Sequence, residues 1–402
     1  MFPTETWVMS RIRTAAFFFC GIYACICDLL PIPKIVSVAC LLPAVYVLCH
    51  MRLRKPFCLA SRSFLSWYGL FALFVCLSAI WSPNSLKYSS DDTVNTIFVY
   101  KRMFNALFLT AIFIQLRPTA SELIVGLKGL LLGCVLGCSV VLINENGLIG
   151  YTRLGTISYG AGPTFGNVAV IGVAVSMFFL YEKKSSKVYA FLLLFQLFAV
   201  ALSGSRQGIL CALLYILLIS FFKNRVSLWK CLKYSIVALV LLAVVLVALM
   251  KIDFLYNAIG FRIEDLLAGH DGSNIERKIM RDYAMKIFFD NPIIGVGIHG
   301  FAVLFGRFYG WSVWSHCGFT EILSCYGLVG FFLFYRYFWN GIKNSVKELD
   351  RNRLVGSLFL AFVINTLLFD AFFVIFLDVR SIFLMGVILK PYISETVAYE
   401  KC

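Results

Sequence analysis

Long runs of apolar residues alternate with short polar segments along most of the chain. Most runs approach the roughly 20 residues that an α-helix needs to cross a bilayer, whereas a barrel strand needs only about 10 alternating residues. The pattern therefore predicts about twelve transmembrane helices. We place them at residues 14–30, 34–49, 64–81, 93–115, 122–143, 167–181, 188–204, 207–222, 234–250, 318–335, 354–377 and 379–390.

The composition agrees with a membrane protein and excludes several other classes. Hydrophobic residues make up 60% of the 402-residue chain and charged residues only 14%, and the mean hydropathy is +0.86. A soluble domain carries about a quarter charged residues. A cytosolic enzyme, a disordered chain and a collagen-like fibre are therefore excluded, and the fold class is predicted to be an all-α polytopic membrane protein.

The basic residues indicate how the helices are oriented. The chain has 36 Lys and Arg against 21 Asp and Glu, a net charge of +15. If the N-terminus lies inside, short basic clusters such as Arg52 to Lys55 and Lys223 to Arg225 all fall inside, as the positive-inside rule requires. We therefore expect both termini to be cytoplasmic, and we expect membrane lipids but no nucleic acid among the partners.

This topology divides the chain into three parts. Residues 1–250 would hold transmembrane helices 1–9, and residues 318–402 would hold helices 10–12 and a cytoplasmic tail. Between helices 9 and 10, residues 251–317 would form one long loop on the outer side, the largest extramembrane segment in which a site could form.

The long loop contains a helix-like stretch from Glu276 to Phe288. Helical spacing puts its apolar residues on one face and sets Arg277 and Arg281 side by side at the edge of that face. Two guanidinium groups at the rim of a helix on the membrane can hold an anion. The alternative is a surface helix whose arginines meet lipid phosphates.

Two more candidates lie at the outer ends of spans. Arg206 follows a very short Ser-Gly-Ser turn between two apolar runs, where a charge is costly unless it has a partner or a role. His316 comes just before the helix predicted from Gly318. Its imidazole can take a proton from a hydroxyl, and Glu321, on the same helical face, could orient the ring. A snorkelling arginine and a structural histidine are the alternatives.

Arg206, Arg277 and His316 come from separate regions, yet the topology puts all three on the outer side. Two arginines and a base suit a reaction in which a hydroxyl displaces a pyrophosphate. The sequence has no phosphate-binding P-loop, dinucleotide fingerprint or acidic metal cluster. We therefore expect no cofactor, no metal, and a lipid-borne pyrophosphate as the donor.

At these residues the sequence resembles the O-antigen ligase and Wzy-type polymerase superfamily of bacterial envelopes. The similarity lies in four motifs: the R-x3-L pattern from Arg206 to Leu210, Arg277 ahead of an N-P-h-h-G-h-G turn at 291–297, the H-x10-G-x-x-G pattern from His316 to Gly330, and a polar, glycine-rich loop with Arg153. Glu321 matches a frequent acidic position of the third motif.

The resemblance implies a GT-C-like, metal-independent, inverting glycosyltransferase on the periplasmic side of the bacterial inner membrane. The donor would be an undecaprenyl-pyrophosphate-linked glycan. The acceptor would be lipid A–core in a ligase, or a second lipid-linked glycan in a polymerase. His316 would be the general base, Arg206 and Arg277 would hold the pyrophosphate, and Arg281, Glu321 and Arg153 would bind substrate.

Three functions stay open from the sequence: the ligase, the polymerase, and a transporter or flippase of a lipid-linked glycan. A flippase should carry charges near the middle of the bilayer, whereas Lys101, Arg102, Lys128 and Asp370 lie nearer to the ends of their spans. Cys317 departs from the ligase motif, which usually has Asn, Ser or Gln after the histidine.

Overall fold

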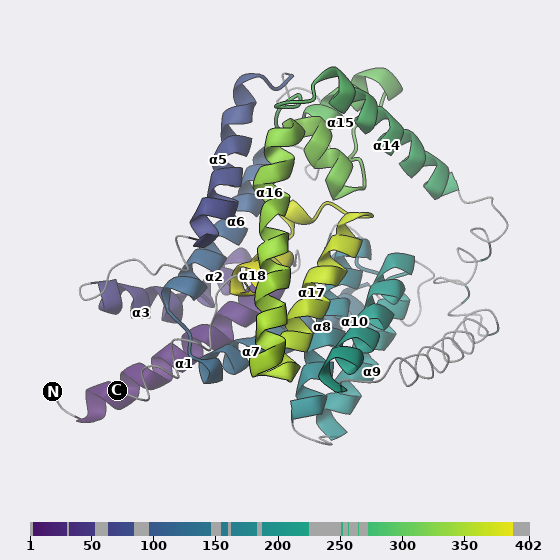
Figure 1. Ribbon diagram of the computed structural model, residues 1–402. Helices are drawn as coiled ribbons and strands as arrows, with labels where there is room; N and C mark the ends of the chain where they lie inside the picture. Colours follow the sequence, from purple (N-terminus) through teal and green to yellow (C-terminus); the bar gives the residue numbers. More distant parts are fainter. Residues whose placement is uncertain are drawn as a thin grey trace.

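The computed structural model of the chain is all-helical, with no strand in the part that it describes (Figure 1). It describes residues 3–29, 32–52, 63–83, 96–145, 154–159, 162–182, 187–224 and 272–388, and also Lys251, Tyr256 and Glu264. The helix predicted at 234–250 lies outside the described residues, as does most of the segment between that helix and residue 272.

Seven of the described helices are long and apolar enough to cross a membrane. They are α1 (Pro3–Ile26), α6 (Thr96–Gln115), α7 (Ala120–Asn144), α8 (Gly162–Glu182), α10 (Arg206–Asn224), α16 (Gly318–Arg351) and α17 (Arg353–Asp370). The shorter elements are α2 (Lys34–Ala39), α3 (Leu42–Arg52), η1 (Leu65–Gly69), α5 (Leu70–Leu77), η2 (Ser78–Ile80), α9 (Lys187–Leu202), α14 (Gly272–Asp290), α15 (Gly300–Tyr309), η5 (Ile375–Leu377) and α18 (Val379–Ile388).

The helical membrane class is confirmed, but the prediction of about twelve spans is not. The run at 34–49 is divided between α2 and α3, and Pro43 lies in the first turn of α3, where its missing N–H breaks no helical hydrogen bond. The run at 354–377 ends as a helix at Asp370. Apolar composition alone could not locate these breaks, because loops buried between helices are as apolar as the helices.

Close contact between small residues holds the first helices together. A Cβ atom added at Gly129 of α7 would lie 1.9 Å from the carbonyl oxygen of Phe18 in α1, and one added at Gly21 would lie 2.3 Å from that of Gly126. Apolar side chains gain little by leaving lipid, so such backbone approach is a main source of attraction between membrane helices. α8 is buried along most of its length and packs against α7, α9, α10 and α17.

The structure differs from the sequence prediction most clearly in α16, which reverses direction at Gly327. The φ of Gly327 is +62° and its ψ is −163°, which only glycine adopts readily. In a straight helix the Cα atoms of Phe319 and Tyr335 would be roughly 24 Å apart, yet their rings stack with centroids 4.8 Å apart. Residues 318–326 therefore fold back beside the following turns as a helical hairpin, and the single span predicted over 318–335 is wrong.

The turn at 291–297 supplies the hydrogen bonds that this reversal interrupts. The amides of Val296 and Gly297 donate to the carbonyls of Ser324 and Cys325, at 3.0 and 2.7 Å. In the other direction, the carbonyls of Pro292 and Ile293 accept from the amides of Leu328 and Val329, at 2.8 and 3.1 Å. The ends of both half-helices are thus satisfied inside the protein, as an apolar environment requires.

Candidate active site

Arg206 is the first residue of α10, as the sequence pattern predicts, and two buried serines shape the turn before it. The Ser205 hydroxyl accepts a hydrogen bond from the Gly208 amide at 3.1 Å and so caps the helix. The Ser203 hydroxyl donates to the Val200 carbonyl at 2.7 Å and accepts from the Ser205 amide. Between them, Gly204 has a φ of +59°. The Ser-Gly-Ser sequence therefore fixes the point at which the arginine leaves the backbone.

The start of α10 lies beside the end of α17. The side-chain amide of Gln207 donates to the Phe369 carbonyl at 2.9 Å. One helical turn further along, the side-chain amide of Asn365 donates to the Cys211 carbonyl at 2.7 Å. These two bonds hold the two helices together and place Arg206 at the end of α17.

Asp370, the last residue of α17, joins this end to the histidine loop. Its side chain is fully buried and accepts from the Tyr335 hydroxyl and, at 3.0 Å, from the Ile375 amide. A Cβ atom added at Gly318 would lie only 1.7 Å from its Oδ1. The Gly318 amide itself donates to the Phe373 carbonyl at 3.0 Å. The end of α17 therefore touches Gln207, next to Arg206, and Gly318, two residues after His316.

The loop that carries His316 is held by hydrogen bonds on both sides of the histidine. His316 has a φ of +55°, in the left-handed region that non-glycine residues seldom adopt. Before it, the Ser315 amide donates to Oε2 of the fully buried Glu321 at 2.7 Å. The Cys325 thiol donates to Oε1 of the same carboxylate at 3.5 Å. Glu321 therefore fixes the backbone before His316, and its predicted role in orienting the ring stays a prediction.

Arg277 and Arg281 lie on α14, which confirms the predicted helix and extends it at both ends. The buried residues of α14 include Met280, Ala284 and Ile287, and this face packs on α15 and α16. The sequence pattern placed α14 flat on the membrane, but protein covers much of its apolar face. Ile279, predicted for the same face, is 40% exposed. Both arginine side chains are partly buried.

An aromatic cluster fastens α14 to α15, a helix that the apolar pattern does not predict. The ring of Tyr283 lies 5.5 to 6.4 Å from four rings of α15, measured between centroids. Those rings belong to Phe301, Phe305, Phe308 and Tyr309. In Figure 1, α14 and α15 lie together at one end of the bundle, beside the reversal of α16.

Residues 189–335 match the family model described as O-Antigen ligase. This segment thus matches the O-antigen ligase superfamily, and we call it the O-antigen ligase domain. It begins in α9, ends in the second half of α16, and contains Arg206, Arg277, Arg281, His316 and Glu321. No curated protein matches the chain.

The O-antigen ligase domain contains most of the candidate residues that the sequence predicts. The structure connects some of these residues more directly than others. Arg206 and His316 are linked through the end of α17. Arg277 and Arg281 are attached to the same hairpin from another direction, through the packing of α14 on α16. Arg153, a predicted substrate-binding residue, lies outside the described residues. Asp370, at the junction, belongs to α17 beyond the domain, and a charge within an apolar run was its only sequence signal.

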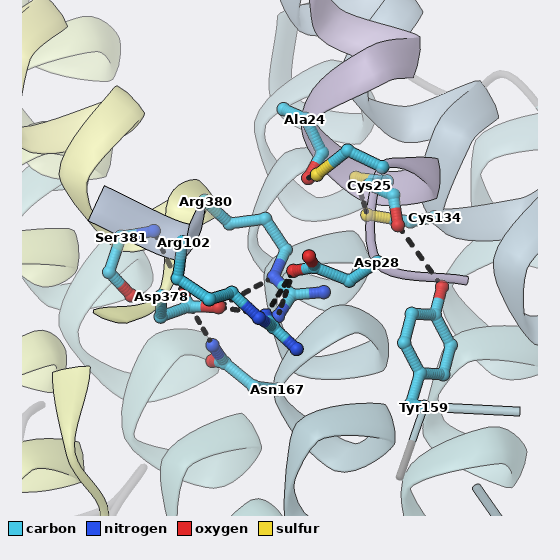
Figure 2. A network of polar contacts seen from close by, with 11 residues as sticks. Ala24, Cys25, Asp28, Arg102, Cys134, Tyr159, Asn167, Asp378, Arg380 and Ser381 are labelled. Carbon is cyan, nitrogen blue, oxygen red and sulfur yellow. Dashed lines mark hydrogen bonds and ion pairs between the residues drawn. The ribbon is translucent and has the colours of Figure 1, made fainter. Parts of the chain in front are cut away.

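A second polar region, outside the O-antigen ligase domain, is missed by the sequence pattern (Figure 2). The fully buried guanidinium of Arg380 in α18 donates from Nε to Asp378 Oδ1 at 2.8 Å. Its Nη2 lies 3.8 Å from Asp28 Oδ2, to which Arg102 of α6 also donates. Asn167 of α8 donates to Asp378 at 3.0 Å. These contacts tie the end of α1 to α6, α8 and α18.

Within the described residues, no three His, Cys, Asp or Glu side chains are grouped closely enough to hold a metal ion. The candidate site contains partly buried arginines, the imidazole of His316 on a constrained loop, and two fully buried carboxylates. Glu321 bonds to this loop at Ser315, and Asp370 lies against it at Gly318. Such a set can hold an anion and exchange a proton.

Proposed function

We propose that the protein is an O-antigen ligase with a GT-C-like fold in the bacterial inner membrane. It would transfer the glycan of an undecaprenyl-pyrophosphate-linked donor to lipid A–core on the periplasmic face. The observation that carries this proposal is that the O-antigen ligase domain contains Arg206, Arg277 and His316. The end of α17 then links the helix that starts at Arg206 to the loop of His316.

The proposed reaction is a single inverting displacement without a metal ion. Neutral His316 takes the proton of the acceptor hydroxyl, and the oxygen attacks the anomeric carbon of the donor. The bond from that carbon to the pyrophosphate oxygen breaks, and undecaprenyl pyrophosphate leaves with the electron pair. The guanidinium groups of Arg206 and Arg277 bind the pyrophosphate oxygens and stabilise the charge that develops on them.

The remaining predicted residues would act around this step. Arg281, one turn from Arg277 on α14, and Arg153 would add positive charge along the path of the donor. Glu321 and Asp370 would act as positioning residues. Glu321 accepts from the amide of Ser315, just before His316, and Asp370 holds the Ile375 amide, two residues from the Phe373 carbonyl that accepts from Gly318. A constrained base costs less conformational entropy to orient when the acceptor arrives.

A polymerase of the same superfamily is the second candidate, and Cys317 is the observation that favours it. The Cys317 side chain is buried and makes no capping hydrogen bond to α16. An amide or hydroxyl at this position could bond the neighbouring backbone or an acceptor sugar, whereas a thiol does so weakly. In the polymerase the acceptor would be a second lipid-linked repeat unit.

Deletion of the gene followed by gel analysis of the lipopolysaccharide tests the proposal. Loss of a ligase leaves bare lipid A–core, while loss of a polymerase leaves core that carries a single repeat unit. A full ladder in the deletion strain would contradict both. Plasmid-borne wild-type protein should restore the ladder, and the His316→Ala variant, present at equal membrane level, should not.

A further inference from the structure

Exposed lysines lie beside Arg102, at the edge of the ionic network that Figure 2 shows. Lys101 precedes Arg102 on α6, and Lys34 is the first residue of α2. The ammonium groups of Lys101 and Lys34 lie next to each other, and both lysines are exposed. The Arg102 side chain is 15% exposed. We call Lys34, Lys101 and Arg102 the α2–α6 basic cluster.

The nearby carboxylates do not balance the charge of this cluster. Asp378 is already occupied by Arg380 and by hydrogen bonds from Asn167 and from Ser381, whose amide lies 2.9 Å away. Asp28 accepts a hydrogen bond from Arg102, and its carboxylate also forms an ion pair with Arg380. Among the described residues, the network with its cluster thus has four cations and two carboxylates. Two adjacent ammonium groups repel one another unless an anion lies against both.

The surroundings of the cluster indicate what kind of anion this would be. Lys101 lies five residues from the start of α6, at a depth of roughly 8 Å along the helix axis. Apolar side chains near it are strongly exposed: Ile97 is 67% exposed and Phe104 55% on α6, and Ile35 is 79% exposed on α2. An apolar surface that surrounds paired lysines faces lipid tails below and lipid headgroups at the level of the ammonium groups.

We propose that Lys34, Lys101 and Arg102 bind the phosphate of an anionic lipid headgroup, at a site on other helices than those that carry Arg206, Arg277 and His316. The two lysines supply positive charge at the surface. Arg102, which is held by its ion pair with Asp28, contacts the phosphate from the side nearer the protein interior. Because Asp28 also faces Arg380, a bound lipid would stabilise the join between α1, α2, α6 and α18.

Lipid retention by the purified full-length protein tests this site. Native mass spectrometry would compare binding of phosphatidylglycerol, which is anionic, with that of zwitterionic phosphatidylcholine. The Lys34→Gln/Lys101→Gln variant should bind phosphatidylglycerol roughly 25-fold more weakly, about fivefold for each lysine, with phosphatidylcholine unchanged. The matched control is Lys343→Gln/Lys347→Gln, two exposed lysines on α16. Equal losses in both variants, or none in the first, would overturn the proposal.

Two further measurements keep the result independent of folding and of the proposed reaction. In lipid-free detergent the Lys34→Gln/Lys101→Gln variant should unfold at the same temperature as the wild type or higher, because a repulsion is removed. Added phosphatidylglycerol should stabilise the wild type and the control but not this variant. Inorganic phosphate that displaced the lipid at equal concentration would overturn the headgroup assignment and give the site to free phosphate. None of these readouts requires glycan transfer.

Discussion

At the residue scale, the backbone of His316 is the feature that most favours a catalytic role. A left-handed conformation at a non-glycine residue costs of order 1–3 kcal/mol and persists only where its surroundings impose it. Here Glu321 holds the Ser315 amide and Phe373 holds the Gly318 amide, so the strained residue is fixed on both sides. Strain concentrated at the proposed base is consistent with an imidazole that is oriented before substrate binds.

Removal of the imidazole should therefore reduce transfer and leave donor binding intact. We expect His316→Ala to lose roughly 10²–10⁴-fold in turnover. His316→Gln should recover little, because an amide keeps a hydrogen bond but cannot accept the proton. The measurement is transfer per mole of folded protein, with a donor-binding assay beside it. Normal transfer by the Gln variant would reject the base.

The control for this experiment should be His50, which is exposed on α3. His299 is unsuitable, although the sequence motifs do not single it out. Its side chain is 2% exposed and its ring lies 5.5 Å from that of Trp314. Alanine at this position would disturb packing next to the loop of His316 and mix a folding defect with a catalytic one.

The proposed pyrophosphate clamp gives a second prediction. Arg206→Ala and Arg277→Ala should each lower transfer by roughly 10²–10³-fold, the usual effect of removing one group that stabilises developing charge. Lysine at either site should retain more activity than alanine and less than arginine, since it keeps the charge but loses the planar fork. Steady-state transfer assays on purified variants measure this. Lys286→Ala, exposed on α14, should be silent, and full activity in either alanine variant would exclude that residue from the clamp.

At the scale of elements, the hairpin in α16 and the turn at 291–297 form one unit. A Cβ atom added at Gly295 would lie 2.4 Å from the Cys325 carbonyl carbon, and one added at Gly327 would lie 2.4 Å from that of Ile293. Each motif thus contains the glycine that lets the other approach. This explains physically why the two patterns occur in one domain, although 30 or so residues separate them.

Substitution of Gly327 should reveal that coupling. Gly327→Ala combines a disfavoured backbone conformation, of order 1–3 kcal/mol, with a clash against backbone, and should markedly lower the unfolding temperature in detergent. Gly310→Ala has the conformational cost alone, because its φ is +86° but nothing lies within 4 Å of the added Cβ. Gly272→Ala, on α14 with open space and no such φ, should be neutral or slightly stabilising. Equal stability of the Gly327 and Gly310 variants would show that the hairpin and turn are not tightly docked.

At the scale of the whole molecule, the apolar bundle contains two polar regions with different roles: one at the end of α17 and the ionic network around Arg380. The arginines of the first region are partly buried, and loops join the elements around the end of α17, which suits binding and release. In the network of Asp28, Arg102, Asp378 and Arg380, the last two side chains are almost completely buried, and unpaired charges there would be very costly. We interpret the first region as the site and the second as the contact that keeps the first and last helices together.

The proposed chemistry as a whole should be independent of divalent metal. The clamp consists of guanidinium groups, and Asp271, Glu276 and Asp282 lack the spacing of metal ligands in the sequence. Transfer by the purified protein should survive excess EDTA without loss. Activity that disappears with EDTA and returns when the ion is added back would contradict the metal-free mechanism.

The sequence by itself determined the class of fold and the positions of the main candidates. Hydropathy reports the solvent of each segment, so long apolar runs identify membrane helices whatever their arrangement. Local structure was equally predictable, because the Ser-Gly-Ser turn before Arg206 and the amphipathic stretch with Arg277 depend only on near neighbours along the chain. These predictions were confirmed as α10 and α14.

Only the tertiary structure decided the reversal of α16, the place of Asp370 and the ionic network. Each depends on residues far apart in sequence, such as the contact of Gly318 with Asp370 or of Asp28 with Arg380. An apolar run looks the same whether it continues across the membrane or turns back, because its hydrogen bonds can be satisfied within the helix or by another loop. Which partner satisfies them is a property of the packed molecule.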